Sequence, residues 1–152
     1  MTGTGPETRE GACHCGAVRF RAVLPKGLAS ANRCNCSFCE MRGAVVLTAE
    51  ADSFEVLSGA DALTLYQFGT NAAEHHFCSA CGIYIHHRRR SDPSEMGVNV
   101  ACLDGLSPFD FARIPISDGR HHVKDGHPDR VAGTLTYVPA DRTTDASSET
   151  DA

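Results

Sequence analysis

The sequence predicts a mainly β fold of antiparallel sheets with a few short helices. With 152 residues, the chain has the length of one ordinary domain. Short segments rich in Val, Ile, Phe, Tyr and Thr recur along it, separated by Gly, Pro, Asp and Ser, which is the pattern of strands and turns. Signals for helices are confined to two short stretches. We therefore expect one β domain without internal repeats.

The expected strands are each near the usual strand length of about five to six residues. They cover residues 17–23, 43–49, 54–58, 63–68, 74–78, 83–87, 97–101 and 134–138. Alternation supports the first of them, because Val18, Phe20 and Ala22 fall on one face. Arg19 and Arg21 fall on the other. Such alternation is typical of an antiparallel strand with one solvated face.

Two short helices and two polar tails complete the expected organisation. One helix is expected at residues 37–42, after the second cysteine cluster, and the other at residues 107–113, which begin with Ser-Pro. Residues 1–10 are small and polar, and residues 140–152 hold no apolar side chain larger than alanine. We expect both of these segments to be disordered tails. The folded domain is thereby expected at residues 11–139.

Composition and charge argue against two classes of function. Lys and Arg number 14 against 19 Asp and Glu, a formal net charge of −5, whereas general nucleic-acid binders are usually basic. No run of about 20 apolar residues is present that could span a membrane. The first residues lack the basic and apolar segments of a secretory signal peptide, so we expect a reducing, cytoplasmic location.

Cysteine is the residue type that carries the chemistry, because seven of the eight cysteines fall in three short motifs. The motifs are Cys13-x-Cys15, Cys34-x-Cys36-x-x-Cys39 and Cys78-x-x-Cys81, and Cys102 stands alone. Clustered thiols in a reducing compartment usually bind a metal ion, and these spacings favour zinc. The alternatives are disulfides and an iron or iron–sulfur centre, although the commonest iron–sulfur motifs use four cysteines at other spacings.

The first and last motifs predict a structural zinc site. Cys78 and Cys81 have the form of a zinc knuckle, in which a tight turn between strands supplies two thiolates and Gly82 allows a close approach to the metal. Structural zinc takes four ligands, and the pair Cys13 and Cys15, also followed by a glycine, is the natural complement. Such a site would tie the first strand to the middle of the chain.

The middle motif offers only three thiolates within six residues. A tetrahedral zinc ion held by Cys34, Cys36 and Cys39 would be one ligand short, and an open position is typical of catalytic zinc. A small thiol bound there would lose its proton, and the thiolate is the nucleophilic form. Alternatively, Cys102 or a histidine closes the site and makes it structural. Cys102 alternates with the valines of the preceding strand, which favours a core position.

Histidines and arginines are the further candidates for the site. Histidine doublets occur at residues 75–76, 86–87 and 121–122, and since neighbours in a strand face opposite ways, each doublet offers at most one inward ring. The arginine run at residues 88–90 is either a solvated loop or a site for the carboxylates of an anionic substrate. The candidate substrate-binding arginines are Arg33, Arg42, Arg88 and Arg89.

Together, these motifs resemble the glutathione-dependent formaldehyde-activating enzyme family, which also includes centromere protein V. The resemblance covers about residues 11–138 and rests on GACHCGAVRF, NRCNCSFCEMRGA and HHFCSACGIYIHHRRR, in the family's order and spacing. It implies a β-tent fold of antiparallel sheets around two zinc ions. The ligands it implies are Cys13, Cys15, Cys78 and Cys81 for the structural zinc, and Cys34, Cys36 and Cys39 for the catalytic zinc.

The resemblance also implies a reaction between a small thiol and an aldehyde. The reference reaction joins glutathione to formaldehyde as S-(hydroxymethyl)glutathione, formally the reverse of a carbon–sulfur lyase. The alternative is a non-catalytic zinc module that binds a protein or nucleic acid, and closure of the second site by Cys102 would favour it. A hydrolase of thiol adducts that uses zinc hydroxide is a third option for the same open site.

Overall fold

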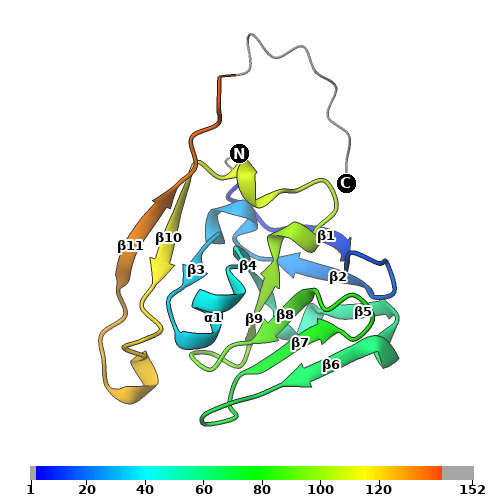
Figure 1. Cartoon of the computed structure of the whole chain (residues 1–152), viewed down its shortest axis with the longest axis horizontal. Coiled ribbons are helices and arrows are strands. Elements are labelled where there is room, and N and C mark those ends of the chain that lie inside the picture. Colours follow the sequence, from blue (N-terminus) through cyan, green and yellow to red (C-terminus); the bar gives the residue numbers. More distant parts are fainter. Residues whose placement is uncertain (1–2, 142–152) are drawn as a thin grey trace.

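A computed structural model describes residues 3–141, which form eleven β-strands in three sheets (Figure 1). The strands are β1 (Glu7–Ala12), β2 (Arg19–Leu24), β3 (Arg33–Cys34), β4 (Val46–Glu50), β5 (Glu55–Ser58), β6 (Leu63–Tyr66), β7 (Glu74–Cys78), β8 (Tyr84–Arg88), β9 (Glu95–Asn99), β10 (Arg113–Ser117) and β11 (Val131–Thr136). The sheets have the orders β1-β2-β5, β11-β10-β3 and β4-β9-β8-β7-β6. Every pairing within them is antiparallel except the short one between β3 and β10. The expected fold class, mainly β with antiparallel sheets and short helices, is confirmed.

The helices are short, as expected, but one of them is shorter than its predicted range. Residues 37–42 form α1 (Ser37–Arg42), with the expected bounds. Of residues 107–113, only Pro108–Asp110 is helical, as a single 3-10 turn, because the chain then extends into β10. The other 3-10 turns are Gly27–Ser30, Ala51–Ser53, Ala60–Ala62, Val100–Cys102 and Val123–Asp125. None of the helices in residues 3–141 is long and apolar enough to cross a membrane.

The core forms where β2 packs against β4. Val18, Phe20 and Ala22 are fully buried there, as the alternation predicts. Arg19 and Arg21 lie on the opposite face and form ion pairs at the surface. Burial of each large apolar side chain contributes roughly 1.5–3 kcal/mol, so this face anchors the first sheet to the rest of the molecule.

The N-terminal segment is more ordered than its polar composition predicts. The expected tail at residues 1–10 is wrong in part, because β1 begins within it and pairs with β2 over its full length. An ion pair of 2.8 Å between Glu10 and Arg21 joins the two strands, and pairing of this kind needs no apolar side chain. Of the expected C-terminal tail at residues 140–152, the part from residue 142 lies outside the described residues.

A hairpin of β10 and β11 stands beside β3 and α1 (Figure 1). The sequence did not predict β3 or β10, because β3 has two residues and β10 contains Pro115, which cannot donate to a neighbouring strand. The parallel pairing of β3 with β10 sets Ser117 opposite Cys34. It therefore brings the loop after β10 to the middle cysteine motif.

Candidate metal centres

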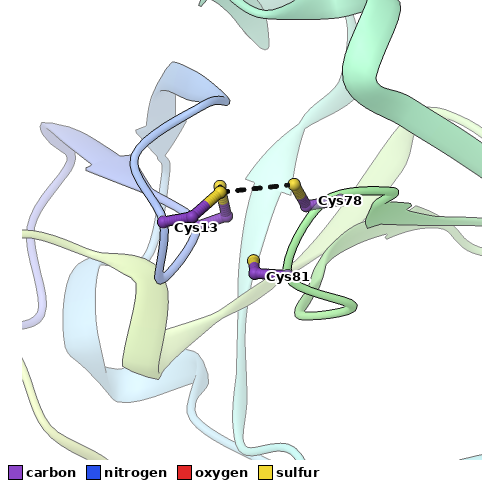
Figure 2. Close-up of side chains that lie close together, drawn as sticks. Cys13, Cys78 and Cys81 are labelled. Atoms are coloured by element: carbon purple, nitrogen blue, oxygen red, sulfur yellow. Dashed lines mark hydrogen bonds between the residues drawn. The ribbon is translucent and has the colours of Figure 1, made fainter.

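Two cysteine pairs that are far apart in the sequence meet in space. Cys13 and Cys15 lie in the turn between β1 and β2, and Cys78 and Cys81 lie in the turn between β7 and β8 (Figure 2). The four sulfur atoms lie within 4.8 Å of one another. The Sγ–Sγ distances are 3.6 Å for Cys13 and Cys15 and 3.7 Å for Cys15 and Cys78, far beyond a disulfide bond of about 2.05 Å. The four free thiols could hold a metal ion.

The glycine after each of these pairs is explained by the shape of the turn. Gly16 and Gly82 have φ angles of 78° and 75°, in the left-handed region that glycine adopts readily. A Cβ atom at either position would have no atom within 4 Å, so contact with the protein does not require glycine. The Gly82 amide instead donates to the Cys78 carbonyl oxygen at 2.7 Å and closes the turn.

The four-cysteine group lies at the edge of the hydrophobic core, with Cys15 exposed to solvent. Cys13 and Cys78 are only 4% and 0% exposed, and both pack in the main apolar cluster. The Val18 amide donates to Cys13 Sγ at 3.3 Å, a contact that favours a thiolate. A metal ion bound here would cross-link the β1–β2 turn to the β7–β8 turn.

Cys102 lies near the four-cysteine group and is a buried core residue, as its alternation favours. Its thiol donates to the Tyr84 carbonyl oxygen at 3.5 Å, and its side chain is 6% exposed. Burial, and then nearby charge at Cys13 and Cys81, raise the pKa of Cys102 to about 12. Cys102 belongs to neither group of sulfur atoms, so it does not close the second one.

The second group is built around the first turn of α1. Cys34 ends β3, Cys36 is the N-cap residue of α1, and Cys39 lies within the helix. The Cys36 amide donates to Cys34 Sγ and the Cys39 amide donates to Cys36 Sγ, both at 3.4 Å. The three sulfur atoms lie within 4.8 Å of one another, and no other Cys, His, Asp or Glu in residues 3–141 joins the set. The group is therefore one ligand short of a tetrahedron.

Crowding of three sulfur atoms limits how far this group can ionise without a cation. The pKa of Cys36 is lowered to about 2, because the thiols of Cys34 and Cys39 and two backbone amides donate to its sulfur. The pKa of Cys34 is raised, chiefly by its hydrogen bond to Cys36. The pKa of Cys39 is raised by its hydrogen bonds to Cys34 and Cys36. A bound metal ion would remove this conflict by stabilising all three thiolates.

Arg42, the last residue of α1, forms a hydrogen bond with the second group. Its Nη2 donates to Cys39 Sγ at 3.2 Å, and its Nη1 contacts His75 Nδ1 at 3.0 Å. Its guanidinium carbon lies 3.6 Å from the centre of the Tyr84 ring, a cation–π contact. This arginine, expected as a candidate for substrate binding, is instead committed to the cysteine group and its surroundings.

A cavity of about 710 Å³ adjoins the second group, and Cys34, Cys36 and Cys39 all line it. Its volume falls within the range of roughly 300–1,000 Å³ that is usual for small-molecule sites. The charged side chains in its wall are Lys26, Arg89, Arg90, Glu95, Asp118 and Asp129. Of the expected arginines Arg33, Arg42, Arg88 and Arg89, only Arg89 is in the wall, and Arg90 is an addition.

The cations in the cavity wall differ in how far they are neutralised. Arg89 is paired with Glu95 at 3.1 Å, and Arg90 with Asp125 at 2.6 Å. Lys26 has no acidic partner among the described residues. The free positive charge in the wall is therefore modest, and Lys26 is its clearest source.

The loop after β10 covers part of the second group. Ser117 and Gly119 line the cavity, and Gly119 packs directly on the cysteines. A Cβ atom at Gly119 would lie 2.3 Å from Cys34 Sγ and 3.0 Å from Cys36 Cβ, closer than real contacts allow. Only glycine therefore fits at this position, and the sequence contains no motif that indicates it.

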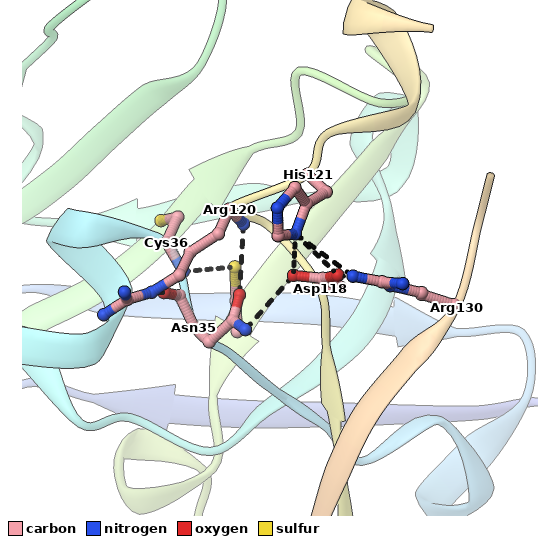
Figure 3. A network of polar contacts seen from close by, with 7 residues as sticks. Asn35, Cys36, Asp118, Arg120, His121 and Arg130 are labelled. Carbon is pink, nitrogen blue, oxygen red and sulfur yellow. Dashed lines mark hydrogen bonds and ion pairs between the residues drawn. The ribbon is translucent and has the colours of Figure 1, made fainter. Parts of the chain in front are cut away.

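Asp118 anchors this loop through a network of polar contacts (Figure 3). Its side chain is only 3% exposed, and it accepts hydrogen bonds from Asn35 Nδ2 at 3.2 Å and from Arg130. His121 Nδ1 lies 3.0 Å from the same carboxylate. The Arg120 amide donates to Asn35 Oδ1 at 3.1 Å, so Asn35, between two of the cysteines, is held by the loop twice. Sequence reasoning missed this network, because the partners are more than 80 residues apart.

The histidine doublets divide between the two faces of their strands, as expected. His75 and His87 line the cavity, and their rings stack at 5.0 Å. His76 and His86 lie on the other face and stack at 4.6 Å. From the third doublet, only His122 lines the cavity. Each doublet thus supplies one ring to the cavity.

These features define a β-sheet protein with two candidate cysteine-ligated metal centres, one in the core and one beside a cavity. The sequence profile described as glutathione-dependent formaldehyde-activating enzyme matches residues 8–113. This match covers more than half of the chain, and the chain therefore belongs to that family. The loop after β10 lies beyond the matched residues.

Two individual proteins are similar to this chain. A Halomonas elongata protein, whose name places it provisionally among the glutathione-dependent formaldehyde-activating enzymes, is 43% identical over 81 residues. The match spans 47% of this chain and half of that protein's length. The crystal structure of a Rhodobacter sphaeroides protein is 54% identical, with a TM-score of 0.69, and the comparison covers 70% of this chain and 98% of the other.

Proposed function

We propose that this chain is a zinc-dependent enzyme of the carbon–sulfur lyase type that joins a small thiol to an aldehyde. The reference reaction combines glutathione with formaldehyde to give S-(hydroxymethyl)glutathione. The observation that carries the proposal is the placement of three cysteines, one ligand short of a tetrahedron, in the wall of a cavity of about 710 Å³. Membership of the family supports these classes of substrate.

Both cysteine groups suit zinc by the chemistry of their ligands, and the first group also by the spacing of its sulfur atoms. Zinc with Zn–S bonds of about 2.3 Å in a tetrahedron places its sulfur ligands about 3.8 Å apart. The Sγ–Sγ distances of 3.6 and 3.7 Å in the first group are close to that value. We assign Cys13, Cys15, Cys78 and Cys81 to a structural zinc ion, and Cys34, Cys36 and Cys39 to a catalytic one.

The chain's own residues bind and orient the reactants beside the second group. When bound there, zinc would supply positive charge that stabilises the thiolate form of a thiol. Lys26 and Arg89 lie in the cavity wall, where they can bind the carboxylates of a glutathione-like thiol. Arg42 donates to Cys39 and holds that sulfur in place. Fixing the thiol and the aldehyde in one cavity lowers the entropic cost of their encounter.

The alternative of a non-catalytic zinc module receives less support from the structure. Closure of the second group by Cys102 would have favoured it, but Cys102 is buried near the first group. A hydrolase of thiol adducts would use the same open position and differs only in the reaction. A cytoplasmic location is part of the proposal, since free thiols persist in reducing compartments.

Magnetisation-exchange NMR tests the proposed reaction directly. Glutathione and formaldehyde reach equilibrium with their adduct spontaneously, so only the exchange rate reports catalysis. We expect zinc-loaded protein to accelerate exchange between the free and adduct signals, and zinc-free protein to have no effect. Exchange that is unchanged by zinc-loaded protein, with this and other small thiols, would contradict the proposal and favour the binding module.

Cysteine variants separate the roles of the two groups. Cys36→Ser removes a ligand beside the cavity, so we expect exchange to fall by at least about 100-fold, because zinc is lost there while the domain remains folded. Cys13→Ser breaks the core group and should mainly harm folding. Cys102→Ser is the matched control, since its hydroxyl can donate to the same carbonyl and the rate should be retained. Full activity of Cys36→Ser would contradict the mechanism.

A further inference from the structure

His75 is held in one orientation at the edge of the cavity. The residue is 4% exposed and lines the cavity from β7. Its ring stacks on Phe68 and His87, with centroids 5.8 and 5.0 Å apart, and packs at a tilt against Phe38 at 4.6 Å. Three aromatic neighbours leave the ring little freedom to rotate. A group held this firmly can act without reorganisation during a reaction.

The hydrogen bonds of His75 determine which ring nitrogen carries the proton. Arg42 Nη1 lies 3.0 Å from His75 Nδ1, and a guanidinium group can only donate. Nδ1 is therefore the acceptor, and the neutral ring carries its proton on Nε2. Burial, and then the charge of Arg42, lower the pKa of His75 to about 4, so the ring is neutral at pH 7.

The Nε2 atom of His75 is open to the cavity. It has no hydrogen-bond partner among the described residues, and it is not among their fully buried, unpaired atoms. The ring nitrogens in that condition belong to His76 and His86, on the opposite face of the sheet. Since His75 lines the cavity, its exposed edge is the Nε2–H side.

One guanidinium group connects His75 to the open cysteine group. The Nη1 atom of Arg42 contacts His75, and the Nη2 atom of the same group donates to Cys39 Sγ at 3.2 Å. The imidazole and the cysteine thus lie on adjoining edges of one flat side chain. Because His75 and the three cysteines line the same cavity, a molecule held at the cysteines shares that cavity with His75.

We propose that His75 is a catalytic residue whose Nε2–H donates a hydrogen bond to the aldehyde oxygen while the thiol sulfur attacks the carbonyl carbon. This inference rests on the proposed function. A sulfur lone pair forms the S–C bond, and the π pair of the C=O bond moves to oxygen. The alkoxide takes one proton from solvent, which balances the proton released by the thiol. His75 keeps its own proton and stabilises the developing negative charge.

The neighbouring ring of His87 has the opposite tautomer. The Tyr84 hydroxyl donates its single proton to the Gly97 carbonyl oxygen at 3.1 Å. Tyr84 Oη also lies 2.6 Å from His87 Nδ1, and both contacts are hydrogen bonds only when His87 Nδ1–H donates to the hydroxyl oxygen. His87 Nε2 is left as an acceptor and cannot stabilise an alkoxide. His122 resembles His75 in tautomer, because its Nδ1 accepts from the Lys124 amide, but its ring is not buried and lacks the same support.

Ring-nitrogen NMR tests the tautomer without reference to activity. Long-range ¹⁵N–¹H correlation spectra of zinc-loaded protein at pH 7 should show His75 with Nε2 protonated and Nδ1 unprotonated. His87 should show the reverse pattern. A charged His75 ring, or one protonated on Nδ1, would overturn the inference, whatever the exchange rate of the protein.

Matched variants of one doublet test the catalytic role. His75→Phe keeps an aromatic ring and removes the donor, so we expect exchange at saturating thiol to fall roughly 100- to 1,000-fold. Zinc content and the dissociation constant for glutathione should stay within about threefold, because the hydrogen bond strengthens only as the oxygen becomes negative. His75→Gln carries an N–H near the position of Nε2 and should restore part of the rate. His76→Phe, on the other face, should be close to wild type.

The outcomes separate the inference from the function on which it rests. If the wild type accelerates exchange and His75→Phe accelerates it equally, the role of His75 is overturned and the proposed function stands. Loss of rate in His122→Phe, with His75→Phe unaffected, would move the donor to the loop after β10. Absence of exchange in the wild type would overturn both, and loss of zinc from His75→Phe would show a structural role instead.

Discussion

Single residues decide the shape of the open cysteine group. Gly119 brings the loop after β10 against Cys34, and Asn35, between two of the cysteines, binds that loop through its side chain. Neither residue carries an ionisable group or a metal ligand. Both act by fixing the backbone around the three sulfur atoms, which is the usual task of residues that surround metal ligands.

Gly119→Ala should therefore disturb the site without touching a ligand. The added Cβ would lie 2.3 Å from Cys34 Sγ, so the loop or the cysteine must move. We expect a loss of about 1–3 kcal/mol in the free energy of unfolding, the usual cost of overpacking, together with weaker zinc binding at the second group. Gly133→Ala is the control, because its Cβ would meet only Ile116 Cδ1, at 3.8 Å. Urea unfolding and a zinc titration measure the two effects, and equal behaviour of the variants would contradict this view.

Strands β7 and β8 place their histidines on two faces of the sheet, one that lines the cavity and one that does not. His75 and His87 face the cavity, whereas His86 is 5% exposed on the other face, between His76 and Phe54. Neither ring nitrogen of His86 has a partner in the described residues, and burial lowers its pKa to about 3. This ring stays neutral while the chain is folded, and it takes up a proton near pH 6.5 when the chain unfolds.

Stability should accordingly depend on pH through His86. Above pH 6.5, His86 is neutral in both states and does not change the free energy of unfolding. As the pH falls from 6.5 toward 3, the free energy of unfolding decreases, because only the unfolded state binds the proton there. Between pH 7 and pH 5, this linkage amounts to up to about 2 kcal/mol. His86→Phe should remove that part of the pH dependence. Urea unfolding of both proteins at the two pH values tests it, and identical pH dependence would show that His86 does not contribute.

The elements that the sequence predicted are those with a local pattern. β2 was indicated by alternation, and β7 and β8 by the turn between Cys78 and Cys81. β1 was missed because it consists largely of charged residues, which are stabilised by pairing with β2 rather than by burial. The same contrast between local patterns and contacts distant in sequence applies to the site. Cysteine spacing indicated both groups, but the contact of Asp118 with Asn35 joins segments more than 80 residues apart and follows no motif.

At the scale of the whole molecule, the two cysteine groups occupy different places. One lies in the core and links two turns, with Cys13 and Cys78 almost fully buried. The other lies beside a cavity and is held by α1, β3 and the loop after β10. Loss of an ion from the first group would unlink two turns that pack in the hydrophobic core, whereas loss of an ion from the second group would leave the core contacts intact. The two metal ions that we propose should therefore differ in how much their loss disturbs the fold.

A chelator should remove the two zinc ions that we propose in separate steps. We expect the ion of the three-cysteine group to leave first, because it has one protein ligand fewer, and with little change in circular dichroism. The ion of the four-cysteine group should leave only as the β signal is lost, because structural zinc binding is coupled to folding. A chromophoric chelator followed together with circular dichroism measures both steps. Cys36→Ser, with one ligand of the cavity group removed, should show only the slow step. If both ions left the wild type together from a folded chain, the core group would not be the structural centre that its burial indicates.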